Sequence, residues 1–244
     1  MDSRVMIVLE GSAGSGKSTL AARLVRDGLG ELAVMPAIIE RPRAYTGYSG
    51  LLLSSVKDYM ASLAVVGHQS SFPVIVDRWV ISNWVYSQIR LRQEGVMLMP
   101  SVKVDHLYRS LVSSFRLLRQ AREEIISRSF GIPNEVWDDV RPQHIIFVFV
   151  MPRPDVIQRY RDQTPTRTFP YDVQEEASLY QYAATILSGT PSWNTEFPSI
   201  TVHPFRYIPE EPYNYDDAVH HLGDIIQQKI VAHWNTDTLT RSST

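Results

Sequence analysis

Three features are absent from this sequence, and each absence excludes a class of protein. The 244 residues include no cysteine, which excludes disulfide bonds, thiol catalysis and cysteine-based zinc sites. No apolar run approaches the ~20 residues that a helix needs to cross a bilayer. The formal net charge is only −2, which argues against a whole surface that binds nucleic acid, although a local basic groove is compatible with it.

What remains is the composition of an ordinary globular protein, with 44% hydrophobic and 20% charged residues. The length suits one α/β domain, alone or with an insertion. An apolar run begins almost at the N-terminus and leaves no room for a signal peptide. We therefore expect a cytoplasmic protein without a membrane partner.

The most specific motif follows directly after the apolar run Val5–Leu9. It consists of Gly11, Ser12, Ala13, Gly14, Ser15, Gly16, Lys17, Ser18 and Thr19. Apolar residues at helical spacing come next, and strand, glycine-rich loop and helix together are typical of a phosphate-binding loop (P-loop). Glycines allow backbone N–H groups to surround an anion, and the helix points its partial positive end at the same anion.

Two side chains of this loop have predicted roles of their own. Lys17 carries a mobile positive charge for the outer phosphates, and the hydroxyl of Ser18 is placed to ligate Mg²⁺. The motif therefore predicts a nucleoside triphosphate site, with ATP and Mg²⁺ as cofactors. The alternative, a Gly/Ser-rich turn with an accidental lysine, does not explain why strand, loop and helix agree.

Strands and helices alternate along the rest of the chain. Further apolar segments predict strands at 34–39, 73–76, 144–150 and 199–203, with helices between them. This alternation predicts an α/β protein of the P-loop type, a three-layer α/β/α fold with a five-stranded parallel sheet. In such sheets ligands bind at the carboxyl ends of the strands.

The expected domain covers residues 1–234, and the polar residues 235–244 form a tail. Residues 94–142 are expected to be a helical insertion, and residues 153–171 an arginine-rich lid. The insertion contains a long amphipathic helix with basic residues from Lys103 to Arg122. A solvated basic face is the simpler interpretation of them, and a surface for substrate phosphates is the alternative.

Charged residues follow the predicted strands at the ends where ligands are expected. After the third strand, Asp77 is suited to hold Mg²⁺ through water, and Arg78 to bind phosphate oxygens. After the fourth, the cluster of Arg159, Arg161 and Arg167 is suited to stabilise the charge of a transferring phosphoryl group. The alternatives are a structural Asp–Arg ion pair and a solvated arginine-rich turn.

Glu40 and Arg41 follow the second predicted strand. A carboxylate at this position is suited to take the proton from an acceptor hydroxyl as a general base. Pairing of Glu40 with Arg41 or Arg43 is the alternative interpretation.

The residues above resemble the motifs of nucleoside and nucleotide kinases, particularly thymidylate kinases and their deoxynucleoside kinase relatives. The matching segments are the loop from Gly11 to Thr19, the residues Asp77-Arg78-Trp79 with Ser82 and Tyr86, and the strand and arginines of 147–167. Thymidylate kinases have an aspartate inside the loop, where this chain has Ala13, and a tyrosine where it has Trp79. The order Glu40-Arg41-Pro42 looks more like deoxynucleoside kinases, whose Glu-Pro supplies the catalytic base.

The resemblance implies a kinase that transfers the ATP γ-phosphate to a deoxynucleoside monophosphate or a deoxynucleoside. The residues it implies for the acceptor are Arg41, Arg78, Trp79, Ser82 and Tyr86, those for catalysis are Lys17, Glu40, Asp77, Arg78, Arg159, Arg161 and Arg167, and the metal ligands are Ser18 and Asp77. Nucleotide kinases often dimerise, so a homodimer is compatible with it.

Two other functions stay open at this point. One is a kinase of a hydroxyl on a modified base in DNA, with the basic helix as its platform. The other is a nucleotide-triggered switch or binding module that hydrolyses slowly for a partner. The sequence leaves the acceptor, the preferred donor base and the oligomeric state undetermined.

Overall fold

The computed structural model describes most of the chain in separate ranges. These are residues 4–27, 31–32, 74–130, 143–164, 171–189, 197, 200–208, and 216–224 without 218 and 221. Within 121–130 only the backbone is described. Several predictions lie outside the described residues, namely those for Glu40, Arg41, Arg167, the strand at 34–39 and the tail at 235–244.

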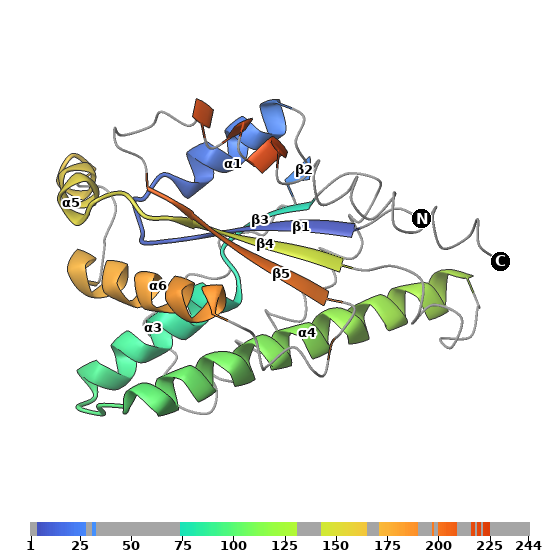
Figure 1. Ribbon diagram of the computed structural model, residues 1–244, viewed down its shortest axis with the longest axis horizontal. Helices are drawn as coiled ribbons and strands as arrows, with labels where there is room; N and C mark the ends of the chain where they lie inside the picture. The colour runs from blue at the N-terminus through green and yellow to red at the C-terminus, as the bar shows by residue number, and fades with distance from the viewer. Residues whose placement is uncertain are drawn as a thin grey trace.

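A parallel sheet with the strand order β2-β3-β1-β4-β5 forms the centre of the fold (Figure 1). Its strands are β1 (Arg4–Glu10), β2 (Glu31–Leu32), β3 (Val74–Asp77), β4 (Gln143–Val150) and β5 (Ile200–Tyr207). Among the described residues, four strands are four residues or longer, which corrects the predicted sheet of five full strands. At the edge, β2 adds a two-residue pairing with β3.

β1 lies between β3 and β4, and this position brings the predicted site together. Leu9 pairs with Asp77 of β3 on one side and with Val148 of β4 on the other. Strands buried on both faces read as continuous apolar runs, as β1 and β4 do. The ends of β1, β3 and β4 therefore meet at one edge of the sheet.

Helices cover both faces of the sheet, as predicted for three layers (Figure 1). They are α1 (Lys17–Arg26), α3 (Val80–Gln93), α4 (Pro100–Phe130), α5 (Pro154–Asp162) and α6 (Val173–Ser188). α1 lies on one face, while α3, α4 and α6 lie on the other, and α5 stands beside the end of the sheet where β1 meets α1 (Figure 1). α1 begins directly after the glycine-rich loop, where the sequence predicts a helix.

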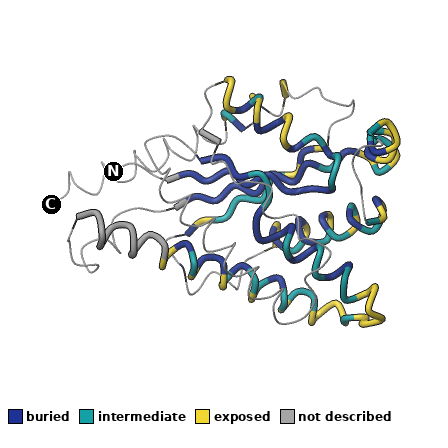
Figure 2. The backbone as a smooth tube through the Cα atoms, turned by 180° about the vertical axis from the view of Figure 1, so that it is seen from behind, coloured by how far each residue is buried: buried dark blue, intermediate teal, exposed yellow. Residues whose placement is uncertain are grey.

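The core is divided by the sheet into two clusters. Leu20 and Leu24 of α1 pack on one face, and both are fully buried. On the other face α4 contributes Leu107, Leu111 and Phe115, which lie along its inner side, while its outer side is exposed (Figure 2). The helix expected within the 94–142 insertion is thus a single 31-residue helix whose apolar stripe belongs to the core.

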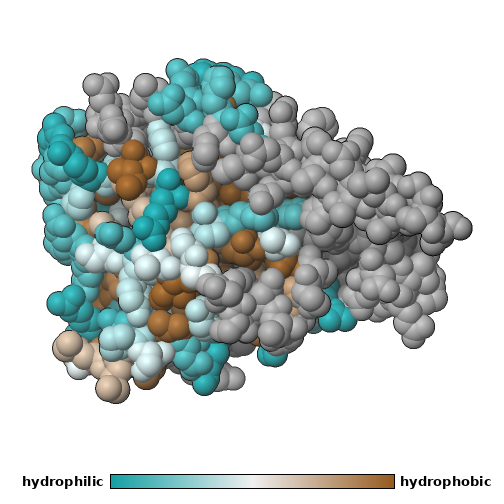
Figure 3. Space-filling view, in the orientation of Figure 1, coloured by the Kyte–Doolittle hydropathy of each residue, from teal (hydrophilic) through white to brown (hydrophobic). Residues whose placement is uncertain are grey.

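The outer side of α4 carries three of the basic residues noted in the sequence, namely Arg109, Arg116 and Arg119. Arg109, whose side chain is 78% exposed, pairs with Asp105 one turn earlier at 2.9 Å. Hydrophilic side chains also gather over α1 and α5, whereas apolar side chains are exposed at the turn between α3 and α4 (Figure 3). None of the helices within the described ranges is long and apolar enough to cross a membrane.

Candidate phosphate-binding site

The loop between β1 and α1 has the backbone shape that its glycines predict. Gly11, Gly14 and Gly16 have φ angles of +149°, +85° and +89°. A Cβ atom on Gly11 would lie 2.3 Å from the carbonyl oxygen of Val150, at the end of β4. A side chain there would force the loop away from the sheet, so the close approach requires glycine.

Lys17 is the first residue of α1 and lies buried under the loop, with 4% of its surface exposed. Its Nζ donates to the carbonyl oxygen of Ser12 at 2.7 Å and to Oγ of Ser15 at 3.1 Å. Burial, and next the nearby charge of Arg78, lower the pKa of Lys17 to about 7. A bound polyanion would reverse this effect, because it adds negative charge to that of Asp77, Glu176 and Glu10, which already favours the charged ammonium.

Ser18 and Asp77 are in direct contact. The hydroxyl of Ser18 donates to Oδ2 of Asp77 at 2.7 Å, because the pairing of Leu9 with Asp77 sets the end of β3 beside the loop. The other carboxylate oxygen, Oδ1, is buried without a hydrogen-bond partner among the described residues. A hydroxyl beside a carboxylate with an unused oxygen fits Mg²⁺, which prefers oxygen ligands and keeps several waters.

Glu10, the last residue of β1, is a site residue that the sequence analysis missed. Its carboxylate is fully buried and accepts hydrogen bonds from the backbone N–H of Trp79 at 2.9 Å and of Ser82 at 3.1 Å. The hydroxyl of Ser82 also donates to it. Trp79 is the N-cap of α3, and the N-cap makes no side-chain hydrogen bond of its own, so a neighbouring strand caps this helix.

Burial raises the pKa of Glu10 to about 7, although the hydrogen bonds and the charges of Arg78 and Lys17 act in the opposite direction. The sequence contains one signal for this residue. A single charged residue ends an apolar strand directly before the first glycine of the loop. Its partners could not be read from the sequence, since they lie 69 and 72 positions further along the chain.

Arg78 connects β3 to α3 and has a φ angle of +71°, in the left-handed region. Its backbone N–H donates to the carbonyl oxygen of Leu9 at 2.9 Å. Its guanidinium donates to the hydroxyl of Tyr86 and lies over that ring, 5.4 Å from the centroid. Tyr86 in turn stacks on Tyr171 with 5.3 Å between centroids. A non-glycine residue in this region stores strain of about 1–3 kcal/mol, which is typical of functional sites.

Trp79 and Ser82, predicted to bind an acceptor, lie inside the protein. Trp79 is 4% exposed and packs between Phe115 and Phe147, with centroid distances of 6.0 and 6.2 Å. Ser82 is fully buried against Glu10. Both side chains thus pack inside the protein in this structure, and their contact with an acceptor stays a prediction.

Arg161 of α5 is held in a buried ion pair instead of an open lid. Its Nη2 lies 3.0 Å from Oε2 of Glu176, and the two side chains are only 4% and 1% exposed. Nε donates to the carbonyl oxygen of Ala13 at 3.0 Å, and Nη1 to that of Tyr171 at 2.8 Å. Oε2 of Glu176 also accepts from the N–H of Ala13 at 3.0 Å. The ion pair therefore holds both backbone groups of one loop residue.

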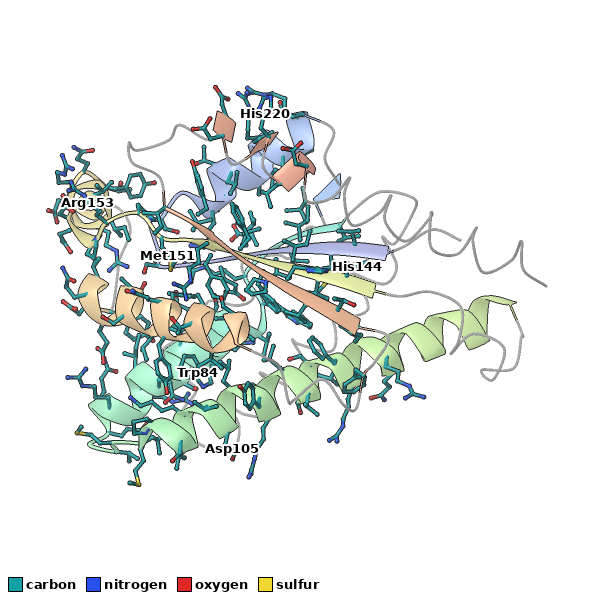
Figure 4. The ribbon with its side chains drawn as sticks, in the orientation of Figure 1. Trp84, Asp105, His144, Met151, Arg153 and His220 are labelled. Atoms are coloured by element: carbon teal, nitrogen blue, oxygen red, sulfur yellow. The ribbon has the colours of Figure 1, made fainter. Side chains whose placement is uncertain are left out.

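Arg159 lies on the solvent side of the same helix. Its side chain is 66% exposed and approaches Asp155 at 3.6 Å. Arg153, at the N-terminus of α5, is also exposed and points outward (Figure 4). Of the three arginines predicted to act together, Arg159 and Arg161 thus point in different directions and Arg167 lies outside the described residues, so their catalytic roles stay predictions.

The structure brings three of the predicted charged residues, together with Ser18, to one edge. Lys17, Ser18, Asp77 and Arg78 surround the loop, at the end of the sheet where Met151 follows β4 and opposite to His144 at the start of that strand (Figure 4). Such an arrangement is suited to bind a polyanion together with a divalent cation.

The sequence matches no family model and no curated protein. Among solved structures, a thymidylate kinase from Candida albicans is similar at 16% identity, covering 93% of this chain and 92% of that chain, with a TM-score of 0.46. A deoxyadenosine kinase from M. mycoides with bound dCTP is similar at 11% identity, over 91% and 99%, with a TM-score of 0.43.

A tRNA isopentenylpyrophosphate transferase from Staphylococcus epidermidis is similar at 11% identity, covering 93% of this chain and 99% of that chain, with a TM-score of 0.34. All three likenesses have low identity and a TM-score under 0.5. They carry no argument about what this chain does.

Proposed function

We propose that this chain is a Mg²⁺-dependent kinase that transfers the γ-phosphate of ATP to a deoxynucleoside monophosphate or a deoxynucleoside. One observation carries the proposal, namely that Lys17, the Ser18–Asp77 pair and Arg78 meet around the loop. Lys17 and the Ser18–Asp77 pair are sufficient to explain nucleotide binding. The guanidinium of Arg78, at the end of the neighbouring strand, supplies the further positive charge that phosphoryl transfer requires.

The loop supports the donor half of this proposal. Its left-handed glycines and the N-terminus of α1 suit the phosphates of ATP, which would be held by the backbone of Gly11, Ser12, Ala13, Gly14, Ser15, Gly16, Lys17, Ser18 and Thr19. Lys17 would become fully charged on binding. Ser18 and Asp77 would hold Mg²⁺, which when bound neutralises negative charge on the phosphates.

Arg78 supports the acceptor half. It stands at the rim of the loop with Tyr86 and Tyr171, so an acceptor phosphate or a transferring group would meet its guanidinium. Arg41, which follows the strand predicted at 34–39, is proposed to help bind the acceptor. Glu40 is proposed to act as the base if the acceptor is a hydroxyl. Arg159 and Arg167 complete the proposed catalytic set, and Arg161 is proposed to serve it by holding the loop in place.

A phosphorylation screen tests this proposal. The protein is incubated with Mg²⁺ and γ-labelled ATP against nucleosides, their monophosphates and DNA, and the products are separated. We expect label on a nucleoside or nucleotide, and a loss of at least ~10²-fold in Lys17→Ala. Arg109→Gln on the outer side of α4 is the control and should keep its activity. Label that appears only as inorganic phosphate contradicts the proposal and favours a slow hydrolase.

Glu40→Gln separates the two acceptor classes. A hydroxyl acceptor needs a base, so kcat should fall by ~10²-fold or more. A monophosphate acceptor arrives ionised and needs cations instead, and near-normal turnover of the variant would identify it.

A further inference from the structure

A chain of hydrogen-bonding side chains connects Arg78 with Glu10 beneath the phosphate-binding loop. Arg78 donates to the hydroxyl of Tyr86, and Tyr86 is hydrogen-bonded to Tyr180. The hydroxyls of Tyr180 and Ser82 lie 2.8 Å apart. Ser82 donates to Oε2 of Glu10. We call these five residues the Arg78–Glu10 relay.

The chemistry of the two ends orients every hydrogen bond between them. A guanidinium only donates, and an ionised carboxylate only accepts. Each of the three hydroxyls then accepts one bond and donates the next, in the order Tyr86, Tyr180, Ser82. Above pH 7, where Glu10 is ionised, the relay is therefore an ion pair extended through three hydroxyls, all of whose bonds point from the cation to the anion.

Burial makes this order strict. Glu10, Ser82 and Tyr180 are completely buried, so water cannot replace a missing partner. In a low dielectric, successive hydrogen bonds also polarise and strengthen one another. Loss of one hydroxyl should consequently be felt at both ends of the relay.

Arg78 needs such an anchor. Its neighbour Asp77 is engaged by Ser18, and no carboxylate in the described part of the chain forms a salt bridge with the guanidinium. The side chain of Arg78 is long, and its backbone is strained at a φ angle of +71°. The hydroxyl of Tyr86 is the group that receives it.

We propose that Glu10 is a positioning residue, which fixes the guanidinium of Arg78 beside the phosphate-binding loop through Ser82, Tyr180 and Tyr86. The carboxylate also caps α3, the helix that carries both Ser82 and Tyr86. One group thus fixes the helix and, through the hydroxyls, the arginine that precedes it. That the fixed arginine serves an acceptor rests on the kinase function proposed above.

NMR of the arginine side chains above pH 7, where Glu10 is ionised, tests the relay without any substrate. A held guanidinium rotates slowly about its Nε–Cζ bond and gives separate Nη–H signals, which Arg78→Lys assigns by removing them. Tyr180→Phe and Ser82→Ala each remove one hydroxyl, and rotation at Arg78 should become about tenfold faster, as expected when one hydrogen bond is lost. Tyr182→Phe is the matched control, because this hydroxyl on the same helix donates to the carbonyl oxygen of Pro100 instead. It should leave the Arg78 signals unchanged.

Glu10→Gln removes the charge and keeps the shape, and should free Arg78 in the same way. If this variant does not fold, the Arg78 signals of Tyr180→Phe still test the proposal. Unchanged Arg78 signals in both Tyr180→Phe and Ser82→Ala would overturn the proposal, as would an equal response in Tyr182→Phe.

Kinetics extend the test to function. For the acceptor found in the screen, KM should rise about fivefold to tenfold in Tyr180→Phe, while KM for ATP stays within about twofold. Equal rises in both KM values would contradict a positioning role. If no acceptor is phosphorylated but the Arg78 signals respond as expected, the kinase proposal fails and the relay stands.

Discussion

Two arginine–glutamate arrangements flank the phosphate-binding loop, and they are built differently. Arg161 and Glu176 form a direct buried pair at 3.0 Å, with Nε, Nη1 and Nη2 of the arginine all donating to the protein. Arg78 and Glu10 are linked only through three hydroxyls. Within the described residues, Nη1 is the guanidinium nitrogen of Arg78 that donates to the protein.

An arginine–glutamate pair therefore has two different roles in this protein. The direct pair uses up its donors on the loop and on Tyr171, so it shapes the loop. The relayed pair orients a guanidinium and leaves donors for a ligand. Sequence reasoning gave both arginines a role in handling phosphate, whereas the contacts of Arg161 are those of a positioning residue.

The largest expected effect comes from breaking the direct pair. Arg161→Ala leaves the carboxylate of Glu176 buried without its charge partner and should lower the free energy of unfolding by ~3–5 kcal/mol. Denaturant unfolding measures this loss. The double variant Arg161→Leu, Glu176→Leu should recover a large part of it, since no buried charge remains. Strictly additive losses would show that the two side chains are not coupled.

Breaking the relayed pair should cost less. Ser82→Ala removes a donor to a buried carboxylate and should lower the free energy of unfolding by ~1.5–3 kcal/mol. Ser110→Ala is the matched control, because its hydroxyl donates to the carbonyl oxygen of His106 within its own helix. The control should stay within ~0.5 kcal/mol. Equal losses of unfolding free energy in both variants would mean that the hydrogen bond from Ser82 to Glu10 contributes no more than an ordinary serine hydrogen bond within a helix.

Stability should also depend on pH through Glu10 of the relayed pair. The pKa of Glu10 is raised to about 7 in the folded protein from 4.5, so the folded state holds more protons across that window. Stability from this group is complete below pH 4.5 and is lost as the pH rises through 7, with a slope of up to ~1.4 kcal/mol per pH unit.

Urea unfolding at pH 5, 6 and 7 tests this slope. Glu10→Gln should flatten it, and the exposed Asp162→Asn should not. The charges that face Glu10, Arg78 from the end of β3 and Lys17 from α1, are constant over this range or titrate at its upper end. A slope that persists in Glu10→Gln would assign the titration to another group.

The smallest effect is expected at Arg159, the arginine of α5 that faces solvent. Arg159→Gln should change the free energy of unfolding by no more than ~0.5 kcal/mol, because an exposed pair with Asp155 contributes little. Its kcat in the phosphorylation assay then reports catalysis without a stability change. A large loss of stability would show that Arg159 shares the structural role of Arg161.

Much of the fold was predictable, because its signals are local in the chain. Lys17 begins α1 where the glycines end. The apolar run that forms β4 has the pattern of a central parallel strand. The short edge strand β2 was not predicted. Two paired residues leave no periodic pattern to read.

The amino-acid sequence alone determined the phosphate-binding loop and the placing of Asp77 and Arg78 at a strand end, since both follow from spacing along one stretch of chain. Only the tertiary structure decided what Glu10, Glu176 and Arg161 do. Their partners are brought together from distant segments by the strand order, and burial then selects which charges are paired directly and which are paired through hydroxyls.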